Sequence, residues 1–563
     1  LTIDSVKFYA GDKDVTSSFA PTSANKGNYL EYAASSDLLN NKDFYGNNAG
    51  TTVKMVIKTH IDAKKVSIET LRAHGHLVEN DKKTETDIKI KNETTVTTTK
   101  ADNQGTWDVD KKVTPPPTTT DSPVPSIKDP VKKVSDSDDL NWDATVKQDG
   151  EKTPGSHNRV TDVTNQWLYT LTQEIPAHTV ELFHYKSFTI TDAVDSCLSY
   201  DVKDIAIKAG DKDYTDKFDV TKGEDNSITL TAKADVLTSD EFYGGNAGNK
   251  IVVSFPVKIS ADAETLKDEN LGHLEIDGKK LAHLQKVSDL QKLSGFTDLV
   301  KSKDNEYVYA FLNQAKTHID SQIKYEGQTG VKDRSTDKVQ TAVETADPTI
   351  KKESSKYEWQ VGDKVDYTIN VGDANSNSIA DNVVITDESL PKAMLPDKDS
   401  ITISSTFDKE KSGAPEDRDI SKDAKIEYTE KGFVITIPKL YRGEVATIKL
   451  TCTAKEKSTY DSITDQWADC LEKANADKKL TCVNGEVIEN RAFVTATLML
   501  KDKDTPPDDL ERVWVNTPHL NIKKSVEKKE YKVGETVKYT LVVTNVHEGT
   551  LARDIVITDQ LQT

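Results

Sequence analysis

The stretch TIKKESSKYEWQVGDKVDYTINV at residues 349–371 decides the fold, because a related stretch, NIKKSVEKKEYKVGETVKYTLVV, stands at residues 521–543. Each copy is followed by a short apolar run that closes on aspartate, VVITD at 383–387 and IVITD at 555–559. Apolar and polar residues alternate within the copies, which is the pattern of half-buried β-strands. Gly and Asp-Lys pairs between the runs are typical of turns. The repetition predicts β-domains arranged in tandem.

A second pair of repeats lies nearer the N-terminus. AGDKDVTSSF at 10–19 recurs as AGDKDYTDKF at 209–218, and FYGNNAG at 44–50 recurs as FYGGNAG at 242–248, with an offset of about 198 residues. A Pro/Thr-rich stretch at 112–130 reads as an extended linker. Further borders are expected at the ADP of 346–348 and the NTP of 516–518.

These borders divide the chain into four segments: 1–121, 122–346, 347–517 and 518–563. The second and third are expected to be complete β-sandwich domains. The first starts in mid-pattern, since Leu1 aligns with Leu198, so we expect it to be the C-terminal part of a sandwich. The fourth ends just after its ITD run and is expected to be the N-terminal part of a further repeat.

One stretch departs from the strand pattern. In LAHLQKVSDLQKLSGF at 281–296, apolar residues recur every three positions, which predicts an amphipathic helix inserted into the second segment. Such a helix would cap one end or face of the sandwich; the alternative is a helix that binds a partner.

Composition excludes several classes of function. The 563 residues carry a net charge of −20, which argues against nucleic acid or an anionic membrane as partner. No apolar run is long enough to span a bilayer, and no signal peptide is visible. Four cysteines are too few for a disulfide scaffold and show no zinc spacing, so we expect no metal or cofactor. Cys470 and Cys482 could form a disulfide, with Cys452 as an alternative partner.

Three residue types recur at matching points of the repeats: a lysine on the opening strand, an aspartate closing an apolar strand, and an asparagine on a late strand. Within each KK pair only one lysine can face the core, and the phase of the preceding apolar residue favours the second. The predicted sets are Lys133, Asp192 and Asn313; Lys352, Asp387 and Asn490; and the half-sites Asn92 alone and Lys524 with Asp559.

A lysine, an aspartate and an asparagine that converge in an apolar core predict a covalent reaction. Burial lowers the pKa of a lysine and raises that of an aspartate, so both can be neutral. The amine can then attack the asparagine carbonyl while the acid relays protons and ammonia leaves. The alternative is ordinary sandwich chemistry, with a snorkelling lysine, a turn aspartate and a capping asparagine. Other acids also lie nearby: Glu181, Asp195, Asp381 and Glu388.

These residues carry a resemblance to a known family. PVKKV, WLYTLTQEIPA, YKSFTITDAVD, EFYGGNAG and FLNQAKT make the second segment similar to the isopeptide-forming domain of Gram-positive fimbrial and surface-adhesin proteins. The third and fourth segments resemble Ig-like stalk repeats of cell-wall proteins. The resemblance implies Lys–Asn isopeptide bonds formed with aspartate catalysis in the collagen-adhesin A manner. The helix insertion, the clustered cysteines and the absence of an LPxTG signal depart from the family pattern.

We therefore expect a row of β-sandwich domains from an extracellular protein attached to the cell wall through regions outside this chain. The function would be that of a stalk or fimbrial shaft, with no enzyme activity beyond a single-turnover cross-link. The alternative is an adhesin module that binds a host or partner-cell protein. A glycan-active enzyme would need a pair of carboxylates in a cleft, for which no motif is present.

Overall fold

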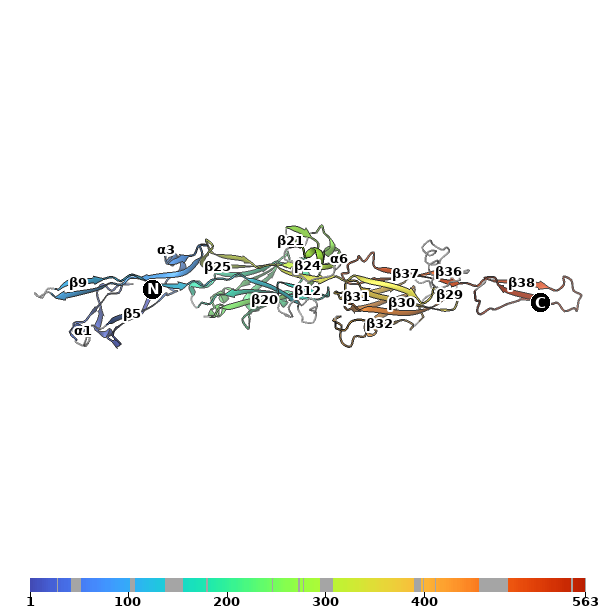
Figure 1. Ribbon diagram of the computed structural model, residues 1–563, viewed down its shortest axis with the longest axis horizontal. Coiled ribbons are helices and arrows are strands. Elements are labelled where there is room, and N and C mark those ends of the chain that lie inside the picture. Colours follow the sequence, from blue (N-terminus) through green and yellow to red (C-terminus); the bar gives the residue numbers. More distant parts are fainter. Residues whose placement is uncertain are drawn as a thin grey trace.

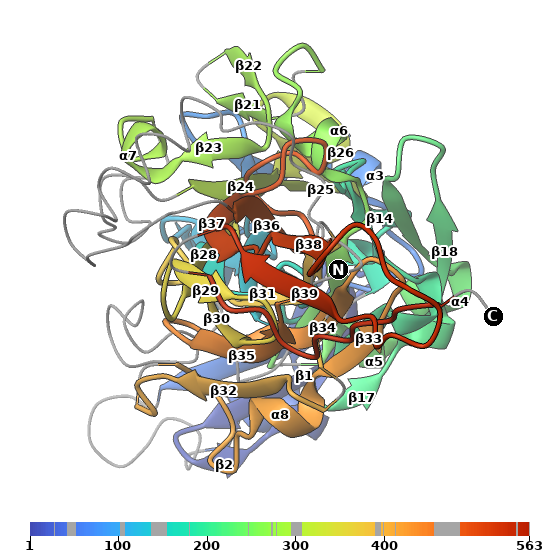
Figure 2. The ribbon, with the colours of Figure 1, turned by 90° about the vertical axis from the view of Figure 1, so that its right-hand side faces the viewer.

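The computed structural model describes residues 1–27, 29–41, 52–101, 107–136, 155–178, 181–245, 247–271, 274–276, 278–293, 307–388, 396–397, 399–410, 412–454, 485–547 and 550–561. These residues form an all-β protein with a few short helices, as the alternating pattern predicts. The segments follow one another along a single long axis (Figure 1). Seen along that axis in Figure 2, they lie one behind another. No helix in the described part of the chain is long and apolar enough to cross a membrane.

The first segment holds small, separate sheets. Its elements are β1 (Thr2–Ala10), β2 (Lys13–Asp14), β3 (Phe19–Pro21), β4 (Tyr32–Ala34), α1 (Ser36–Leu39), β5 (Val53–His60), α3 (Ile68–Ala73), β6 (Leu77–Glu79), β7 (Glu85–Asn92), β8 (Val96–Ala101), β9 (Trp107–Val113) and β10 (Thr118–Pro123). The strand orders are β2-β1-β5, β10-β7-β6, β3-β4 and β8-β9. The linker prediction is wrong in part, because residues 118–123 pair with β7 as strand β10.

The second segment is larger and carries the main core. Its strands are β11 (Val131–Asp136), β12 (His157–Val160), β13 (Trp167–Ile175), β14 (Ser187–Asp192), β15 (Leu198–Ser199), β16 (Ala206–Ala209), β17 (Lys212–Asp213), β18 (Phe218–Lys222), β19 (Ile228–Ala232), β20 (Asn249–Ile259), β21 (Leu274–Ile276), β22 (Lys279–Leu281), β23 (Leu284–Lys286), β24 (Tyr307–Asn313), β25 (Ala315–Tyr325), β26 (Gln328–Ser335) and β27 (Val339–Glu344). Its helices are α4 (Ala234–Leu237), α5 (Asp240–Tyr243), α6 (Ala263–Lys267) and α7 (Val287–Leu290).

Three sheets enclose this core, in the orders β11-β13-β20-β16-β17, β18-β19-β14-β25-β26 and β12-β27-β24-β23. Strict alternation explains the layering: β13 buries every second side chain from Trp167 to Ile175. The core also includes Ile68, Leu71 and Ile88 of the first segment. Polar contacts join the same two segments, since Arg72 donates to the carbonyl oxygen of Gln322 at 2.8 Å.

The predicted helix at 281–296 is shorter than expected. Within the described residues, helix α7 covers only Val287–Leu290 and is preceded by strand β23, which pairs with β24. A short amphipathic helix is marginal by itself, so strand pairing decides the conformation of Leu284. Val287 and Leu290 are fully buried, as the pattern predicted.

The third segment is a two-sheet sandwich. Its elements are β28 (Pro348–Ser354), β29 (Glu358–Gln360), β30 (Lys364–Asp373), β31 (Ala380–Asp387), β32 (Thr402–Thr406), α8 (Ile420–Asp423), β33 (Lys425–Tyr428), β34 (Phe433–Leu440), β35 (Val445–Thr453), β36 (Gly485–Thr495) and β37 (Asp508–Asn516). The sheets run β28-β30-β35-β32 and β29-β37-β36-β31-β34-β33, with one apolar core between them. The fourth segment holds the hairpin of β38 (Leu520–Val526) and β39 (Tyr539–Asn545).

A polar cluster joins the second and third segments. The Ile379 amide donates to the Thr161 carbonyl at 2.8 Å, and Lys439 lies between the carboxylates of Asp162 and Asp381. Burial and the neighbouring Asp162 raise the pKa of Asp381 to about 8, so its carboxyl is protonated at neutral pH. The contact therefore holds one ionised and one protonated acid against a single lysine.

Candidate functional site

The third segment brings its predicted lysine and aspartate together inside the sandwich. Alternation along β28 turns Lys352 inward, where it is 2% exposed, while Lys351 faces solvent. Asp387 is the last residue of β31 and is also buried. The Lys352 ammonium nitrogen contacts Asp387 Oδ2. This contact connects the two sheets of the sandwich, because β28 belongs to one and β31 to the other.

Asn490 completes this site from β36, the strand next to β31. Strand β28 packs across β36 and β37, so the lysine strand lies over the asparagine strand. Asn490 is fully buried, yet neither Oδ1 nor Nδ2 has a partner in hydrogen-bond geometry, and Asp387 Oδ1 has none either. Buried polar atoms without partners are costly and call for an explanation. A covalent bond between the Asn490 side chain and Lys352 is one such explanation.

Burial shifts both acid–base groups of this site toward neutrality. It lowers the pKa of Lys352, an effect that the charge of Asp387 only partly offsets. Burial also raises the pKa of Asp387, and Lys352 opposes the rise. The ring of Tyr367 lies 5.2 Å from the Lys352 nitrogen and closes the apolar wall. A neutral amine beside a protonated carboxyl is the combination that the predicted chemistry needs.

A glycine allows the turn before β34 to lie directly against the backbone of Asp387. A Cβ atom at Gly432 would lie 1.8 Å from the Asp387 carbonyl oxygen, a distance that no side chain permits. Gly432 directly precedes β34, whose Phe433 pairs with Asp387. The turn before β34 therefore fixes the position of the acid.

The second segment has the same arrangement, but the lysine is Lys132 and the prediction of Lys133 is wrong. Lys132 is buried and contacts Asp192 Oδ2, whereas Lys133 is exposed. The phase of β11 is set by Pro130 and Val134, which are both buried and lie an even number of residues from Lys132.

Asn313 ends β24 within this second site and is 2% exposed. Its amide oxygen and nitrogen again lack hydrogen-bond partners. The rings of Tyr169 and Phe255 lie 4.8 and 5.6 Å from the Lys132 nitrogen, and burial lowers the pKa of this lysine. Asn313 stands two residues before Ala315, which pairs with Asp192. Two separate segments thus combine a buried lysine–aspartate contact with a buried asparagine whose amide lacks partners.

The predicted half-sites lie at the two ends of the chain. Lys524 Nζ contacts Asp559 Oδ1 at 2.6 Å and lies 4.7 Å from the ring of Tyr539. Their side chains are 39% and 32% exposed, so this pair is not enclosed. Asn92 is exposed at the end of β7, where it stands opposite Thr118 of β10.

The other acids considered from sequence do not reach the lysines. Glu181 and Glu388 are exposed, and Asp381 belongs to the cluster between segments. Asp195 Oδ2 lies 3.3 Å from His283 Nε2. The possible disulfide of Cys470 and Cys482 lies outside the described residues, and Cys452 is a free, buried thiol.

One polar cluster in the second segment was not predicted from the sequence. Asp195, Cys197 and His283 place a possible ligand atom each within 4.8 Å of the others. His283 Nδ1 lies 2.7 Å from the Ala310 carbonyl oxygen, which leaves Nε2 toward Asp195. Burial lowers the pKa of His283, but the hydrogen bonds of its side chain to Asp195 and Cys197 outweigh burial and raise that pKa to about 9. The geometry is that of a buried imidazolium–carboxylate pair with a thiol beside it.

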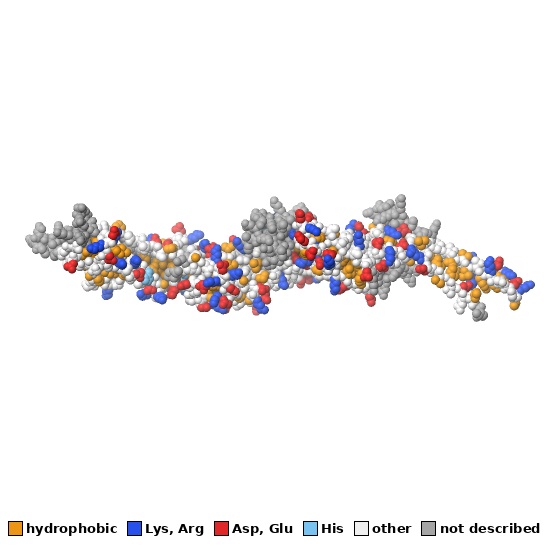
Figure 3. Space-filling model, turned by 90° about the horizontal axis from the view of Figure 1, so that it is seen from below, with side chains coloured by type: hydrophobic (Ala, Val, Ile, Leu, Met, Phe, Trp, Pro, Cys, Tyr) orange, Lys and Arg blue, Asp and Glu red, His pale blue; other side chains and the backbone are white. Residues whose placement is uncertain are grey.

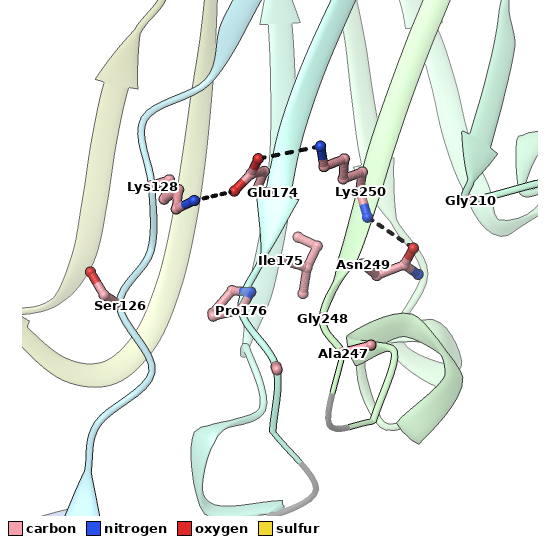
Figure 4. Close-up of a pocket in the computed structure, with 11 residues that line it drawn as sticks. Ser126, Lys128, Glu174, Ile175, Pro176, Gly210, Ala247, Gly248, Asn249 and Lys250 are labelled. Atoms are coloured by element: carbon pink, nitrogen blue, oxygen red, sulfur yellow. Dashed lines mark hydrogen bonds and ion pairs between the residues drawn. The ribbon is translucent and has the colours of Figure 1, made fainter.

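A surface pocket of about 470 Å³ lies where β13 ends and β20 begins, beside residues 126–128 and away from both sites (Figure 4). Glu174 stands at its edge between Lys128 and Lys250, at 2.7 and 3.5 Å. The pocket shares no residue with either lysine site. Its charged groups are already paired with one another.

Comparisons with known proteins give distant structural likenesses. No family model matches the chain, and no curated protein matches it. Among solved structures, the C-terminal domain of the Streptococcus agalactiae AgI/II polypeptide BspA aligns at 12% identity and a TM-score of 0.32, over 69% of this chain and 100% of that one. The C-terminal domain of the Streptococcus pyogenes antigen I/II-family protein AspA gives 12% and 0.31, over 69% and 99%.

The full-length major pilin SpaD of Corynebacterium diphtheriae aligns over 88% of this chain and 85% of its own, at 10% identity and a TM-score of 0.24. Likenesses at these values do not establish a family. The function must therefore be argued from the chain's own residues.

Proposed function

We propose that this chain is part of the stalk of an extracellular, wall-attached adhesin or fimbrial protein, stabilised by two intramolecular isopeptide bonds. The bonds are Lys132–Asn313 and Lys352–Asn490. The observation that carries the proposal is the repeated site: a buried lysine touching a buried aspartate, beside a buried asparagine whose amide lacks partners. The repeats and motifs that resemble fimbrial stalk domains support the surface role.

The reaction follows from the geometry and the charge states. Burial favours a neutral Lys352 amine, whose nitrogen attacks Cγ of Asn490. The protonated carboxyl of Asp387 donates a hydrogen bond to the amide oxygen and passes protons to the leaving nitrogen. A C–N bond forms, the original C–N bond breaks, and one ammonia leaves. The product is an uncharged amide, which no longer carries the cost of a buried ion pair.

A cross-link of this kind suits a load-bearing stalk. Strand pairs resist force through hydrogen bonds that contribute about 1 kcal/mol each, whereas the amide is covalent. The bond also requires no oxidant, unlike a disulfide. The chain would then turn over no substrate, and each site would react once.

Intact mass of the full chain tests the proposal. The wild-type chain should be lighter than its sequence mass by two ammonia molecules, and digestion should release branched peptides that join Lys132 to Asn313 and Lys352 to Asn490. Lys352→Met should restore one ammonia, while Lys351→Met, on the solvent face of the same strand, should not. A chain of full sequence mass with unbranched peptides would refute the proposal.

A further inference from the structure

Three side chains that can bind a transition metal meet inside the second segment. Asp195 and Cys197 stand in the turn between β14 and β15, and His283 stands between β22 and β23. A carboxylate oxygen, the thiol sulfur and an imidazole nitrogen all lie within 4.8 Å of one another. Cys197 and His283 are buried, and the side chain of Asp195 is 11% exposed. The cluster is therefore enclosed, except at the carboxylate, which water can reach.

The distance between the carboxylate and the imidazole fits a shared metal ion. Asp195 Oδ2 lies 3.3 Å from His283 Nε2. An N–H···O hydrogen bond is usually shorter, at about 2.9 Å. Zinc binds carboxylate oxygen and imidazole nitrogen at about 2.0–2.1 Å, so two such ligands at a tetrahedral angle lie about 3.3 Å apart. With a Zn–S bond of about 2.3 Å, a thiolate lies about 3.5 Å from either of them, so the Cys197 sulfur needs only a small adjustment.

Contacts outside the cluster hold His283 in the orientation of a metal ligand. The carbonyl oxygen of Ala310 lies 2.7 Å from His283 Nδ1 and accepts its proton, which turns Nε2 toward Asp195. The Ala310 amide in turn donates to the His283 carbonyl oxygen at 2.8 Å, and the ring of Phe311 stacks on the imidazole at 4.4 Å. Metal-binding histidines usually have such a second hydrogen bond, because it fixes the tautomer and the ring orientation.

The turn that carries the other two ligands is also held by hydrogen bonds. Asp195 Oδ1 accepts from the Cys197 amide at 2.8 Å, and Oδ2 is the oxygen that faces His283. The Cys197 carbonyl oxygen accepts from the Ser260 amide at 2.9 Å, and Asn226 Nδ2 donates to the Asp195 carbonyl oxygen at 2.8 Å. A turn fixed in this way loses little conformational freedom when it binds a ligand.

The sandwich itself does not require these residues. Asp195 and Cys197 follow the ITD run of the second segment by three and five residues, and the same count in the third segment gives Leu390 and Lys392. Leucine cannot bind a metal, and a charged lysine repels one. The third segment nevertheless forms both of its sheets around one core. The cluster is therefore a feature that the second segment has in addition to the common fold.

We propose that Asp195, Cys197 and His283 bind one zinc ion, with a water molecule as the fourth ligand on the exposed side of the carboxylate. Thiolate and imidazole ligands favour zinc over Ca²⁺ and Mg²⁺, which prefer oxygen. In the metal-free protein the same residues form a buried imidazolium–carboxylate pair with a thiol beside it. Zinc replaces that pair: the imidazolium and the thiol each release a proton to solvent, and bonds from zinc to nitrogen, sulfur and oxygen form. The thiolate and the carboxylate offset the charge of Zn²⁺, so the complex is neutral and suits a buried site.

The ion joins two parts of the second segment that have separate apolar clusters. Cys197 belongs to the main core. Strands β21 and β24 and helix α7, which lie near His283 in sequence or contact it, share a smaller cluster that includes Leu274, Val287 and Ala310. Zinc therefore cross-links the turn after β14 to this smaller unit. The site uses neither Lys132 nor Asn313, so it stands or falls separately from the proposed isopeptide bonds.

Zinc binding by the full-length chain tests the proposal. The reduced chain is loaded with zinc and dialysed, and its metal content is measured by elemental mass spectrometry. Cys197→Ser should remove one equivalent of zinc per chain and weaken binding by at least about 100-fold, since a direct ligand matters no less than its outer partners. Asp195→Asn should lose the same equivalent. It retains the side-chain oxygen that accepts from the Cys197 amide, so the turn should still fold, and circular dichroism checks this.

Two matched controls separate the cluster from general affinity for zinc. Cys452→Ser removes a second buried thiol, and His318→Gln removes an exposed histidine that pairs with Asp333 at 2.7 Å. Both variants should keep the equivalent that Cys197→Ser loses. Weak surface binding is removed by dialysis. Figure 3 shows acidic side chains interspersed with Lys and Arg over the face in view, and neighbouring cations reduce the affinity of exposed carboxylates for zinc.

Hydrogen exchange locates the ion. Zinc should slow amide exchange in residues 193–198 and 283–286 together, and it should do so in neither region of Cys197→Ser. A wild-type chain that keeps no zinc after dialysis would overturn the proposal, as would equal zinc content in wild type and in folded Asp195→Asn. Protection by zinc in only one of the two regions would overturn the cross-link. The isopeptide bonds are read separately, from the ammonia losses of the same chain.

Discussion

Replacing Asp387 by alanine should leave the third segment folded but unlinked. In the proposed reaction this acid protonates the leaving nitrogen, and it is buried in contact with Lys352. The full-length Asp387→Ala chain should therefore lose one ammonia instead of two. Asn490→Ala should give the same mass deficit, since it removes the carbonyl that the amine attacks.

The thermal cost follows from the size of the loop that the bond closes. The loop from Lys352 to Asn490 spans 139 residues, counting both ends. Closing a loop of that length lowers the entropy of the unfolded chain by an amount worth about 5 kcal/mol. For a domain of this size, the loss corresponds to a melting temperature lower by roughly 10–20 °C. The melting temperature of Asp387→Ala should fall somewhat further than that of Asn490→Ala, because the Asp387 substitution also leaves a buried lysine without its partner.

The assay is intact mass and calorimetry of the full chain, with hydrogen exchange to assign the transition of the third segment. Glu388→Ala is the matched control: this neighbouring acid is exposed, so its removal should leave both the two-ammonia deficit and the melting temperature unchanged. If Asp387→Ala still loses two ammonia molecules, the assignment of the acid from burial is refuted. If the bond is lost but the melting temperature does not move, the loop-entropy argument is wrong.

Three further outcomes are expected. Lys132→Met should reduce the deficit from sequence mass to one ammonia, whereas Lys133→Met, on the solvent face, should leave the deficit at two. Gly432→Ala should slow or prevent the bond in the third segment, because its Cβ displaces Asp387; the branched peptide measures this. The contact between the second and third segments should weaken as pH rises from about 4 to 8. The pKa of Asp381 is about 8 in the closed contact and 3.8 when the carboxyl is free in solvent. Over that range, separation of the two segments allows Asp381 to ionise, so a higher pH favours separation. Amide exchange at the Ile379 N–H, corrected for its intrinsic dependence on pH, should accelerate accordingly, and Asp381→Asn should remove this additional dependence.

The sequence was sufficient for the fold class and for most of the candidate site. Alternation and repeats predicted β-domains in tandem, and the positions of aspartate and asparagine came from repeat alignment alone. The lysine of the second segment was missed because its apolar neighbour Val131 is exposed, while the informative residues are Pro130 and Val134. Lys132 lies two residues after Pro130, and Lys352 lies four residues after Pro348. Counting an even number of residues from the proline at the start of each strand would therefore have selected the correct lysine in both segments.

Other features depend on contacts that no local pattern specifies. The period of three at 281–296 favoured a helix, but pairing with β24 made part of it a strand. His283 lies in that same stretch and meets Asp195 from a distant part of the chain. Neither the packing of Gly432 on Asp387 nor the acid pair between segments has a sequence motif. These are tertiary effects that override local propensity.

The position of each bond determines which part of its segment is shielded from tension. Neither asparagine lies on the last strand: Asn490 is on β36, followed by β37, and Asn313 is on β24, followed by β25 to β27. With the proposed bond in place, force that enters at Lys352 would cross the amide to Asn490, so residues 353–489 would carry none of it. The β36–β37 hairpin beyond Asn490 would remain in the load path, where strand pairing and core packing hold it without a covalent link. In the second segment the unshielded part is longer, from residue 314 to 346, and it includes the strands that pack against the first segment. A stalk built this way would yield slightly at the junctions between its domains while the interior of each domain stays closed.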